Sequence, residues 1–229
     1  MKLPRLYAIL DTGCLPIPNA MYAATEELVA AGCTLLQYRN KAGSARVMLE
    51  QARELRRRFR QGQDSHFSQN QGEVGHPPIR SFSWSQAPVM LIMNDRADLC
   101  LAADFDGVHV GQEDVSPAAV RAIIGPDRWL GVSTHNPEQL HEADLTSADY
   151  LAVGPVFATS SKEKPDPVIG LEGVRRARTL TRKPLVAIGG ISRANAASVI
   201  EAGADSVAVI SDLLRDPRKS AEEFFRILG

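Results

Sequence analysis

Short apolar runs alternate with amphipathic segments along this chain of 229 residues, and this alternation constrains its fold more than any other feature. Eight runs have the length and apolar character of strands, and eight intervening segments have helical spacing. The predicted strands cover residues 5–11, 34–40, 89–94, 107–110, 129–133, 150–156, 185–188 and 206–210. The predicted helical segments cover residues 19–31, 44–60, 97–103, 117–124, 137–143, 171–180, 193–202 and 217–228.

Many of these short strands are apolar on both faces, which is typical of parallel strands that are covered by helices. Eight βα units in 229 residues agree with the usual size of a (β/α)8 TIM barrel. A doubly wound open sheet is the alternative, but that architecture has no need of eight units. The sequence therefore predicts an α/β fold, a single TIM-barrel domain with eight parallel strands over residues 1–229.

Residues 61–87 interrupt the alternation between the second helix and the third strand. They are rich in Gln, Ser, Gly, His and Pro and have no periodicity, so we predict a long, flexible insert. Because the insert follows a helix and precedes a strand, we expect it at the barrel face opposite the active site. We therefore exclude it from the chemistry.

Charge and composition exclude several classes of protein. The formal net charge of −1 does not draw the chain to nucleic acid, and we expect the basic run at residues 56–60 to be a solvated helix end. Three scattered cysteines predict no disulfide framework, which fits a reducing cytosol. We find no signal peptide, and no stretch approaches the roughly 20 apolar residues that span a bilayer. We therefore expect a cytoplasmic protein with no membrane partner.

Polar side chains follow the predicted strands, beginning with the second. Gln37, Arg39 and Lys41 alternate along that strand and share one face. The planar guanidinium of Arg and the compact ammonium of Lys suit a polyanion such as a phosphate. Taken alone, this face could equally be a solvated strand end, but further polar clusters at other strand ends favour a binding site.

Two acids stand at the ends of the next two strands. Asp95 follows Asn94 at the end of the third strand, and Asp114 follows the fourth. Magnesium prefers oxygen ligands and is usually bound by one or two carboxylates together with substrate phosphates. The alternative is that each acid caps the helix behind it. Both acids together, next to Arg39 and Lys41, favour a site for Mg²⁺.

The remaining strand ends carry hydroxyl groups, an ammonium group and glycines. The loops after the seventh and eighth strands are the recurrent phosphate site of this fold, and glycine allows a ligand to approach the backbone. Two anion sites, one of them with carboxylates for a metal, suit the joining of a diphosphate to a monophosphate, with diphosphate as the leaving group. The residues at these remaining strand ends are Ser133, Thr159, Ser160, Ser161, Lys162, Gly189, Gly190, Ile210 and Ser211.

These motifs, in this order, resemble the thiamine phosphate synthase family over nearly the whole chain apart from residues 61–87. The resemblance implies a transferase that condenses 4-amino-5-hydroxymethyl-2-methylpyrimidine diphosphate with 4-methyl-5-(2-phosphooxyethyl)thiazole. The products would be thiamine phosphate and diphosphate, formed by a dissociative mechanism in which Mg²⁺ assists the departure of diphosphate. The chain departs from the family at Ala158, where Pro is commoner, and at Ser161, where Thr is commoner but the hydroxyl is kept.

The resemblance also assigns the residues of the site. One Mg²⁺ per active site would be bound by Asp95 and Asp114, and the catalytic groups would be Arg39, Lys41, Ser133 and Lys162. The pyrimidine diphosphate would be held by Gln37, Arg39, Lys41, Asn94, Ser133 and Lys162. The thiazole phosphate would be held by Thr159, Ser160, Ser161, Gly190, Ile210 and Ser211.

Two other functions remain open at this point. A thiazole tautomerase shares the barrel and the thiazole-phosphate end but should not need a complete diphosphate clamp. A non-catalytic regulator would bind a phosphorylated ligand on the same barrel without turnover. In each case the expected partners are phosphorylated small molecules, with no nucleic acid, and the sequence leaves the oligomeric state open.

Overall fold

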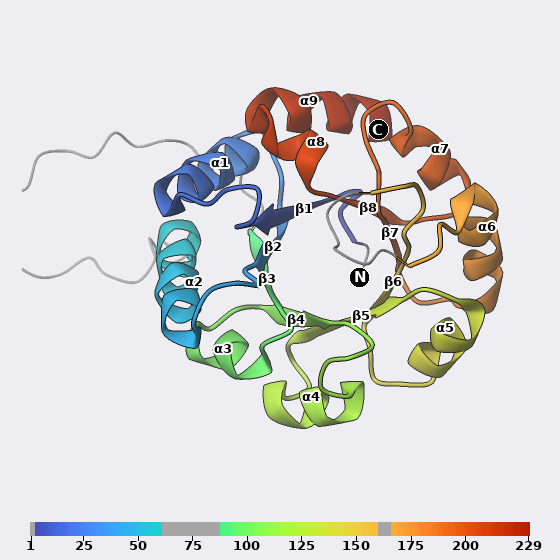
Figure 1. Cartoon of the computed structure of the whole chain (residues 1–229), viewed down its shortest axis with the longest axis horizontal. Helices are drawn as coiled ribbons and strands as arrows, with labels where there is room; N and C mark the ends of the chain where they lie inside the picture. The colour runs from blue at the N-terminus through green and yellow to red at the C-terminus, as the bar shows by residue number, and fades with distance from the viewer. Residues whose placement is uncertain (1–2, 61–87, 160–165) are drawn as a thin grey trace, which may run out of the picture.

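Eight parallel strands close into a barrel with helices around the outside, in a computed structural model that describes residues 3–60, 88–159 and 166–229 (Figure 1). The predicted α/β TIM barrel is therefore confirmed. The strands are β1 (Leu6–Asp11), β2 (Leu35–Arg39), β3 (Met90–Asn94), β4 (Gly107–Val110), β5 (Trp129–Thr134), β6 (Tyr150–Val153), β7 (Leu185–Ile188) and β8 (Ser206–Val209). The helices are α1 (Pro18–Ala30), α2 (Ala45–Arg60), α3 (Ala97–Ala102), α4 (Pro117–Ile124), α5 (Pro137–Asp144), α6 (Gly170–Leu180), α7 (Ala196–Glu201), α8 (Ser211–Leu214) and α9 (Pro217–Leu228).

The observed elements differ from the predicted ones mainly at their ends. Strand β6 stops at Val153 because Gly154 and Pro155 follow, and proline has no N–H for a strand ladder. The sequence pattern does not predict α8, whose four residues are too few to show helical periodicity. The predicted insert at residues 61–87 lies outside the described residues.

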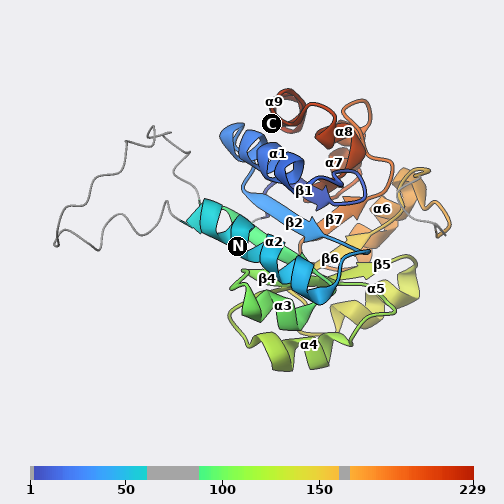
Figure 2. The same cartoon turned by 60° about the vertical axis from the view of Figure 1, so that its left-hand side comes forward.

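The barrel closes because β1 pairs with both β2 and β8. Ala8 lies opposite Leu36 on one side and opposite Val209 on the other. The strands lie inside and the helices lie outside them (Figure 2). Alternate residues of each strand point into the barrel or outward to the helices, which gives two buried layers. The inner layer contains Tyr7 and Tyr150, two large polar side chains that are each 1% exposed.

Three similar ion pairs brace the end of the barrel where the strands begin. Asp106, directly before β4, accepts a hydrogen bond from the N–H of Leu91 in β3 at 2.8 Å. The same carboxylate binds both terminal nitrogens of Arg56 in α2, at 2.7 and 3.0 Å. The pattern recurs with Asp149, Leu130 and Arg121, and again with Asp205, Leu185 and Arg178. Each of the three aspartates therefore joins a helix to two neighbouring strands.

The basic run at the end of α2 is not simply a solvated helix end. Arg56 is tied to Asp106, and its side chain is only 17% exposed. Arg58 pairs with Glu26 and Glu54, and its guanidinium lies 4.6 Å from the ring centre of Tyr22. The expectation was therefore wrong for these two arginines, because their partners lie on other elements or one helical turn away.

The described residues also bear on the predictions about cysteines and membranes. All three cysteines are free thiols, as their scattered positions predicted. Along the described part of the chain, no helix combines the length and the apolar character needed to cross a lipid bilayer.

The ion pair between Arg56 and Asp106 generates a stability prediction. We expect Asp106→Ala to lower the free energy of unfolding by about 2 kcal/mol, because it removes a charge-assisted bridge and a backbone acceptor together. Glu50→Ala is the control, since Glu50 belongs to an exposed pair with Arg46, and it should cost less than about 0.5 kcal/mol. Urea denaturation measures both variants, and equal costs would contradict a bracing role for Asp106.

Candidate active site

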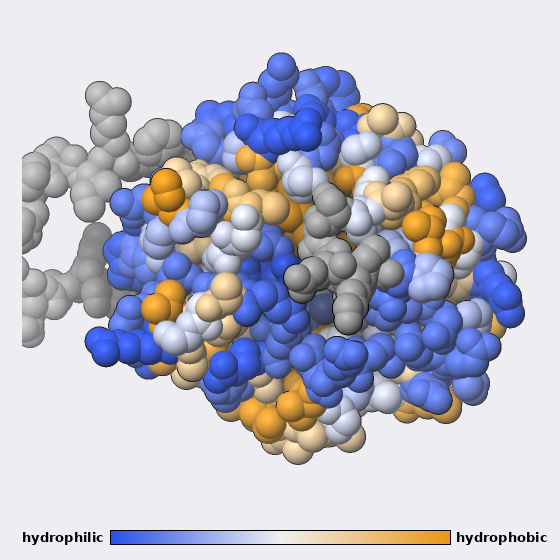
Figure 3. Space-filling view, in the orientation of Figure 1, coloured by the Kyte–Doolittle hydropathy of each residue, from blue (hydrophilic) through white to orange (hydrophobic). Residues whose placement is uncertain are grey.

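Parallel pairing brings the carboxyl ends of all eight strands to one rim of the barrel. Several of the predicted site residues stand on that rim, where β2, β3 and β5 end. Hydrophilic residues predominate around the barrel axis, whereas hydrophobic side chains gather nearer the outer helices (Figure 3). The rim therefore offers a polar surface at which an anionic ligand can be bound.

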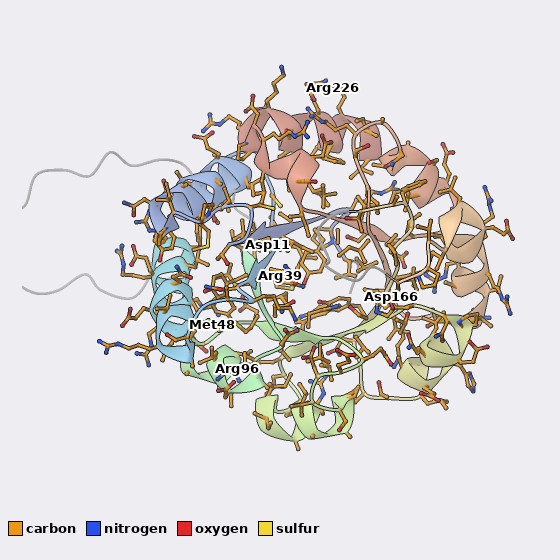
Figure 4. All side chains as sticks on the ribbon, viewed as in Figure 1. Asp11, Arg39, Met48, Arg96, Asp166 and Arg226 are labelled. Carbon is orange, nitrogen blue, oxygen red and sulfur yellow. The ribbon has the colours of Figure 1, made fainter. Side chains whose placement is uncertain are left out.

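Arg39 is paired with a carboxylate that the sequence reading missed. Its Nη1 donates to Oδ2 of Asp11, the last residue of β1, which lies opposite Arg39 in the strand register (Figure 4). Asp11 is only 6% exposed, and its other oxygen accepts the N–H of Gly13 at 2.8 Å. The guanidinium has five N–H donors, so Asp11 orients Arg39 while leaving donors for a phosphate.

Lys41 and the two predicted metal ligands form a second charged group. The Nζ of Lys41 lies 2.6 Å from Oδ2 of Asp95, and Asp114 accepts the N–H of Gly111 at 2.7 Å. Burial raises the pKa of Asp95; Lys41 opposes this rise, and the neighbouring carboxylate of Asp114 adds to it. Asp95 also has a φ of 62°, a left-handed conformation that few non-glycine residues adopt. The structure thus brings together the two carboxylates that the sequence suggested.

This carboxylate pair meets the donor preference of Mg²⁺. Within the described ranges, no group of three or more His, Cys, Asp or Glu side chains is arranged to hold a metal ion. Magnesium is usually bound by one or two carboxylates and completes its shell with water and substrate phosphate oxygens. Asp95 and Asp114 therefore suit an ion that arrives with a phosphorylated substrate, and the metal site stays a prediction.

A chain of buried polar side chains crosses the barrel beneath the rim. Nε2 of Gln37 donates to the Tyr7 hydroxyl at 2.9 Å, and the hydroxyls of Tyr7 and Tyr150 are 3.0 Å apart. The Tyr150 hydroxyl lies 3.0 Å from Nδ1 of His109, whose Nε2 lies 2.8 Å from Oγ of Ser133. This chain connects two predicted substrate-binding residues, Gln37 on β2 and Ser133 on β5.

The three middle members of this chain were not predicted as site residues. Burial lowers the pKa of His109 to about 4, so the imidazole is neutral near pH 7. Burial also raises the pKa values of both tyrosines, which therefore remain phenols. The sequence did contain one signal: Tyr7, His109 and Tyr150 each stand at a strand position whose side chain points into the barrel. A tyrosine on a buried strand is normally interpreted as a core residue. Its hydrogen-bond partners lie far away in the sequence, so the sequence did not reveal the chain.

The predicted thiazole-phosphate end lies where β7 and β8 finish. Gly189 and Gly190 have φ values of 99° and 63°. A Cβ on Gly190 would lie 2.5 Å from the carbonyl oxygen of Ala158, so the glycine makes room for the loop after β6. The sequence suggests that this glycine pair allows close approach of a ligand, and the structure adds a packing requirement. Thr159 ends the described part of that loop.

The other predicted site residues that the structure describes lie at strand ends or at the start of α8. Asn94 ends β3 opposite His109, Ile210 directly precedes α8, and Ser211 is the exposed first residue of that helix. The side chain of Asn195 accepts the N–H of Ser192 and donates to the carbonyl of Gly190, which braces the turn after β7. Three predicted residues, Ser160, Ser161 and Lys162, lie outside the described residues.

Comparison with known proteins gives consistent results. The Thiamine monophosphate synthase family model matches residues 83–213. A thiamine-phosphate synthase of Koribacter versatilis is 54% identical over 231 residues, covering 100% of this chain and 97% of the relative. Another, of Chloroflexus aurantiacus, is 43% identical and covers 90% and 83%. A solved structure of thiamine phosphate pyrophosphorylase from Pyrococcus furiosus has a TM-score of 0.76 and 32% identity, covering 98% of this chain and 95% of its own.

Burial of His109 generates a prediction about pH. Its folded pKa of about 4 lies below the usual 6.5, so the unfolded chain takes up a proton first as the pH falls. Stability that is present above pH 6.5 should therefore be lost as the pH falls toward 4. Between pH 7 and pH 5, wild type should lose about 2 kcal/mol more unfolding free energy than His109→Gln.

Urea denaturation at pH 7, 6 and 5 measures this difference. The control is His141→Gln, which replaces an exposed histidine on α5 that lies outside the buried chain. If His109→Gln loses as much stability as wild type over this range, His109 does not titrate as its burial implies.

Proposed function

The chain belongs to the thiamine monophosphate synthase family, and we propose that it makes thiamine phosphate from a pyrimidine diphosphate and a thiazole phosphate. As a member of this family it is an enzyme, a transferase. The proposed substrates are 4-amino-5-hydroxymethyl-2-methylpyrimidine diphosphate and 4-methyl-5-(2-phosphooxyethyl)thiazole. The second product is diphosphate.

One observation carries this proposal: cations and carboxylates for a diphosphate stand together on three neighbouring strands. Arg39 ends β2, Lys41 follows it, and Asp95 and Asp114 follow β3 and β4. Lys41 touches Asp95, and the carboxylates of Asp95 and Asp114 interact with each other. A protein that binds only a monophosphate has no use for so many charged groups at this corner of the rim.

The proposed reaction is dissociative. The bond between the pyrimidine methylene carbon and the diphosphate oxygen breaks, and its electron pair leaves with diphosphate. The ring nitrogen of the thiazole then gives its lone pair to the methylene cation and forms the new C–N bond. Negative charge grows on the leaving group, so donors and cations placed around it lower the barrier.

The described residues have the following roles in this proposal. Arg39 and Lys41 bind the leaving diphosphate, and Ser133 donates a hydrogen bond to it. Asp11 keeps the guanidinium of Arg39 oriented before substrate binds. Asp95 and Asp114 would hold Mg²⁺, which supplies positive charge against the diphosphate oxygens. Lys162, outside the described residues, is proposed to act beside Arg39 and Lys41.

The thiazole phosphate is proposed to lie at the opposite part of the rim, where β7 and β8 end. The N–H of Gly190 and that of Ser211 donate to no other described residue, so both are available to a phosphate. Ser211 adds an exposed hydroxyl. Thr159, Ser160, Ser161 and Ile210 complete the proposed set.

The test is diphosphate release by purified protein given both substrates, first with Mg²⁺ and then with excess chelator. We expect release to require both substrates, to fall at least about 100-fold without metal, and to match the thiamine phosphate formed. Folded protein that binds the thiazole phosphate but releases no diphosphate would refute the synthase and favour a tautomerase or a regulator.

The proposed diphosphate clamp generates a prediction about Lys41. The side chain of Lys41 is 55% exposed, so Lys41→Ala should hardly change the unfolding free energy. Its turnover should fall about 100-fold or more, because a cation next to the leaving group is lost. Lys219→Ala, on the outer helix α9, is the matched control and should turn over like wild type. Unchanged turnover in Lys41→Ala would remove Lys41 from the clamp.

A further inference from the structure

The hydrogen bonds of the buried chain from Gln37 to Ser133 can all run in one direction or all in the other. The first direction follows from the orientation of the Gln37 amide. Nε2 of Gln37 can only donate, so the Tyr7 oxygen accepts and the Tyr7 hydrogen points to Tyr150. The Tyr150 hydrogen then points to Nδ1 of His109. Neutral His109 has one N–H, which must be on Nε2 and donates to Oγ of Ser133.

This arrangement fixes what both ends of the chain offer to a ligand. Oγ of Ser133 already accepts from His109, so its own hydrogen is available for an acceptor such as a phosphate oxygen. Nε2 of Gln37 is engaged with Tyr7, and no described group donates to the Oε1 of this side chain. Gln37 therefore presents a carbonyl oxygen, which accepts from an N–H group.

The reverse arrangement offers the opposite pattern. The Ser133 hydrogen would point to His109, and every later hydrogen in the chain would turn round. The amide of Gln37 would also rotate, so that its NH₂ group faced the ligand. Because each hydroxyl has one hydrogen and each link is buried, one end cannot change without the other.

We propose that Tyr7, Tyr150 and His109 are positioning residues that form a hydrogen-bond relay with one direction, from Gln37 to Ser133. An anion at Ser133 requires a donor and therefore selects this direction. The same ligand then meets the carbonyl oxygen of Gln37, which suits the amino group of an aminopyrimidine. The proposal rests on the proposed function for the identity of that ligand, and it adds a link between recognition of its anionic end and of its amine.

The barrel is shaped to hold the relay. A Cβ on Gly131 would lie 2.1 Å from the Tyr150 ring and 2.4 Å from Nδ1 of His109, so these side chains fill the space that glycine leaves. The rings of His109 and Tyr150 are stacked, with centroids 5.5 Å apart. Both ring positions are therefore fixed by packing as well as by hydrogen bonds.

The first experiment is a double-mutant cycle on binding of inorganic diphosphate with Mg²⁺, measured by calorimetry. Tyr150 does not touch Ser133, yet Tyr150→Phe frees the His109 tautomer, so we expect the Kd to rise about fivefold. In a Ser133→Ala background, the same change should alter the Kd less than twofold. Equal effects in both backgrounds would overturn the relay.

Control variants separate the relay from packing. Tyr38→Phe also removes a buried hydroxyl, but Tyr38 faces α2 and bonds to Gln51, so its Kd should match wild type. Tyr7→Phe replaces Tyr150→Phe in the double-mutant cycle if Tyr150→Phe fails to fold. With both substrates, Tyr7→Phe should raise the KM of the pyrimidine diphosphate about tenfold and leave that of the thiazole phosphate within twofold.

The second experiment reads the direction itself. Nitrogen-15 NMR of histidine-labelled protein with bound diphosphate should find His109 protonated on Nε2 and not on Nδ1, with its signals assigned from His109→Gln. Protonation on Nδ1 would overturn the proposal. Neither the calorimetric cycle nor the NMR measurement needs turnover: a protein that makes no thiamine phosphate but passes both would keep the relay, whereas an active synthase that fails them would lose the relay alone.

Discussion

Closure of the sheet is the constraint on which the rest of this structure depends. Because β1 pairs with both β2 and β8, no strand is left at an edge, and all strands point the same way. Loops at the carboxyl ends therefore face one another across the rim. At the other end, the carboxylates of Asp106, Asp149 and Asp205 tie helices to strand starts. Bracing and the proposed chemistry thus lie at opposite ends of the barrel.

Closure also creates an interior that side chains must fill, and this chain fills part of it with polar groups. A buried hydroxyl or imidazole costs free energy unless it is hydrogen-bonded. Tyr7, Tyr150 and His109 meet that requirement with one another, and the chain continues to Gln37 and Ser133 below the rim. The need to satisfy buried polar atoms therefore also fixes the orientation of Gln37 and Ser133, two residues proposed to bind substrate.

Much of the fold could be predicted from the sequence because it rests on local periodicity. Each predicted strand occurs in the structure, whereas the four-residue α8 was missed since it has no period to detect. The sequence predicted that charged residues at the ends of different strands lie together, and Lys41 does contact Asp95, 54 residues away. It did not show which partners orient these residues or fill the barrel: Asp11 lies 28 residues from Arg39, and Tyr7 lies 143 from Tyr150. Those pairs exist only after the barrel has closed.

The charges of the rim explain why the overall composition carries so little information about function. Within the protein, Arg39 is paired with Asp11 and Lys41 with Asp95. The cations that suit a diphosphate are thus balanced locally, which agrees with a net charge of −1 for the whole chain. A multiply charged substrate must compete with these carboxylates or bring cations of its own. Under the proposed function, a substrate that entered with a divalent metal would satisfy both conditions, since Asp95 and Asp114 would hold the metal and Arg39 and Lys41 would bind the phosphates.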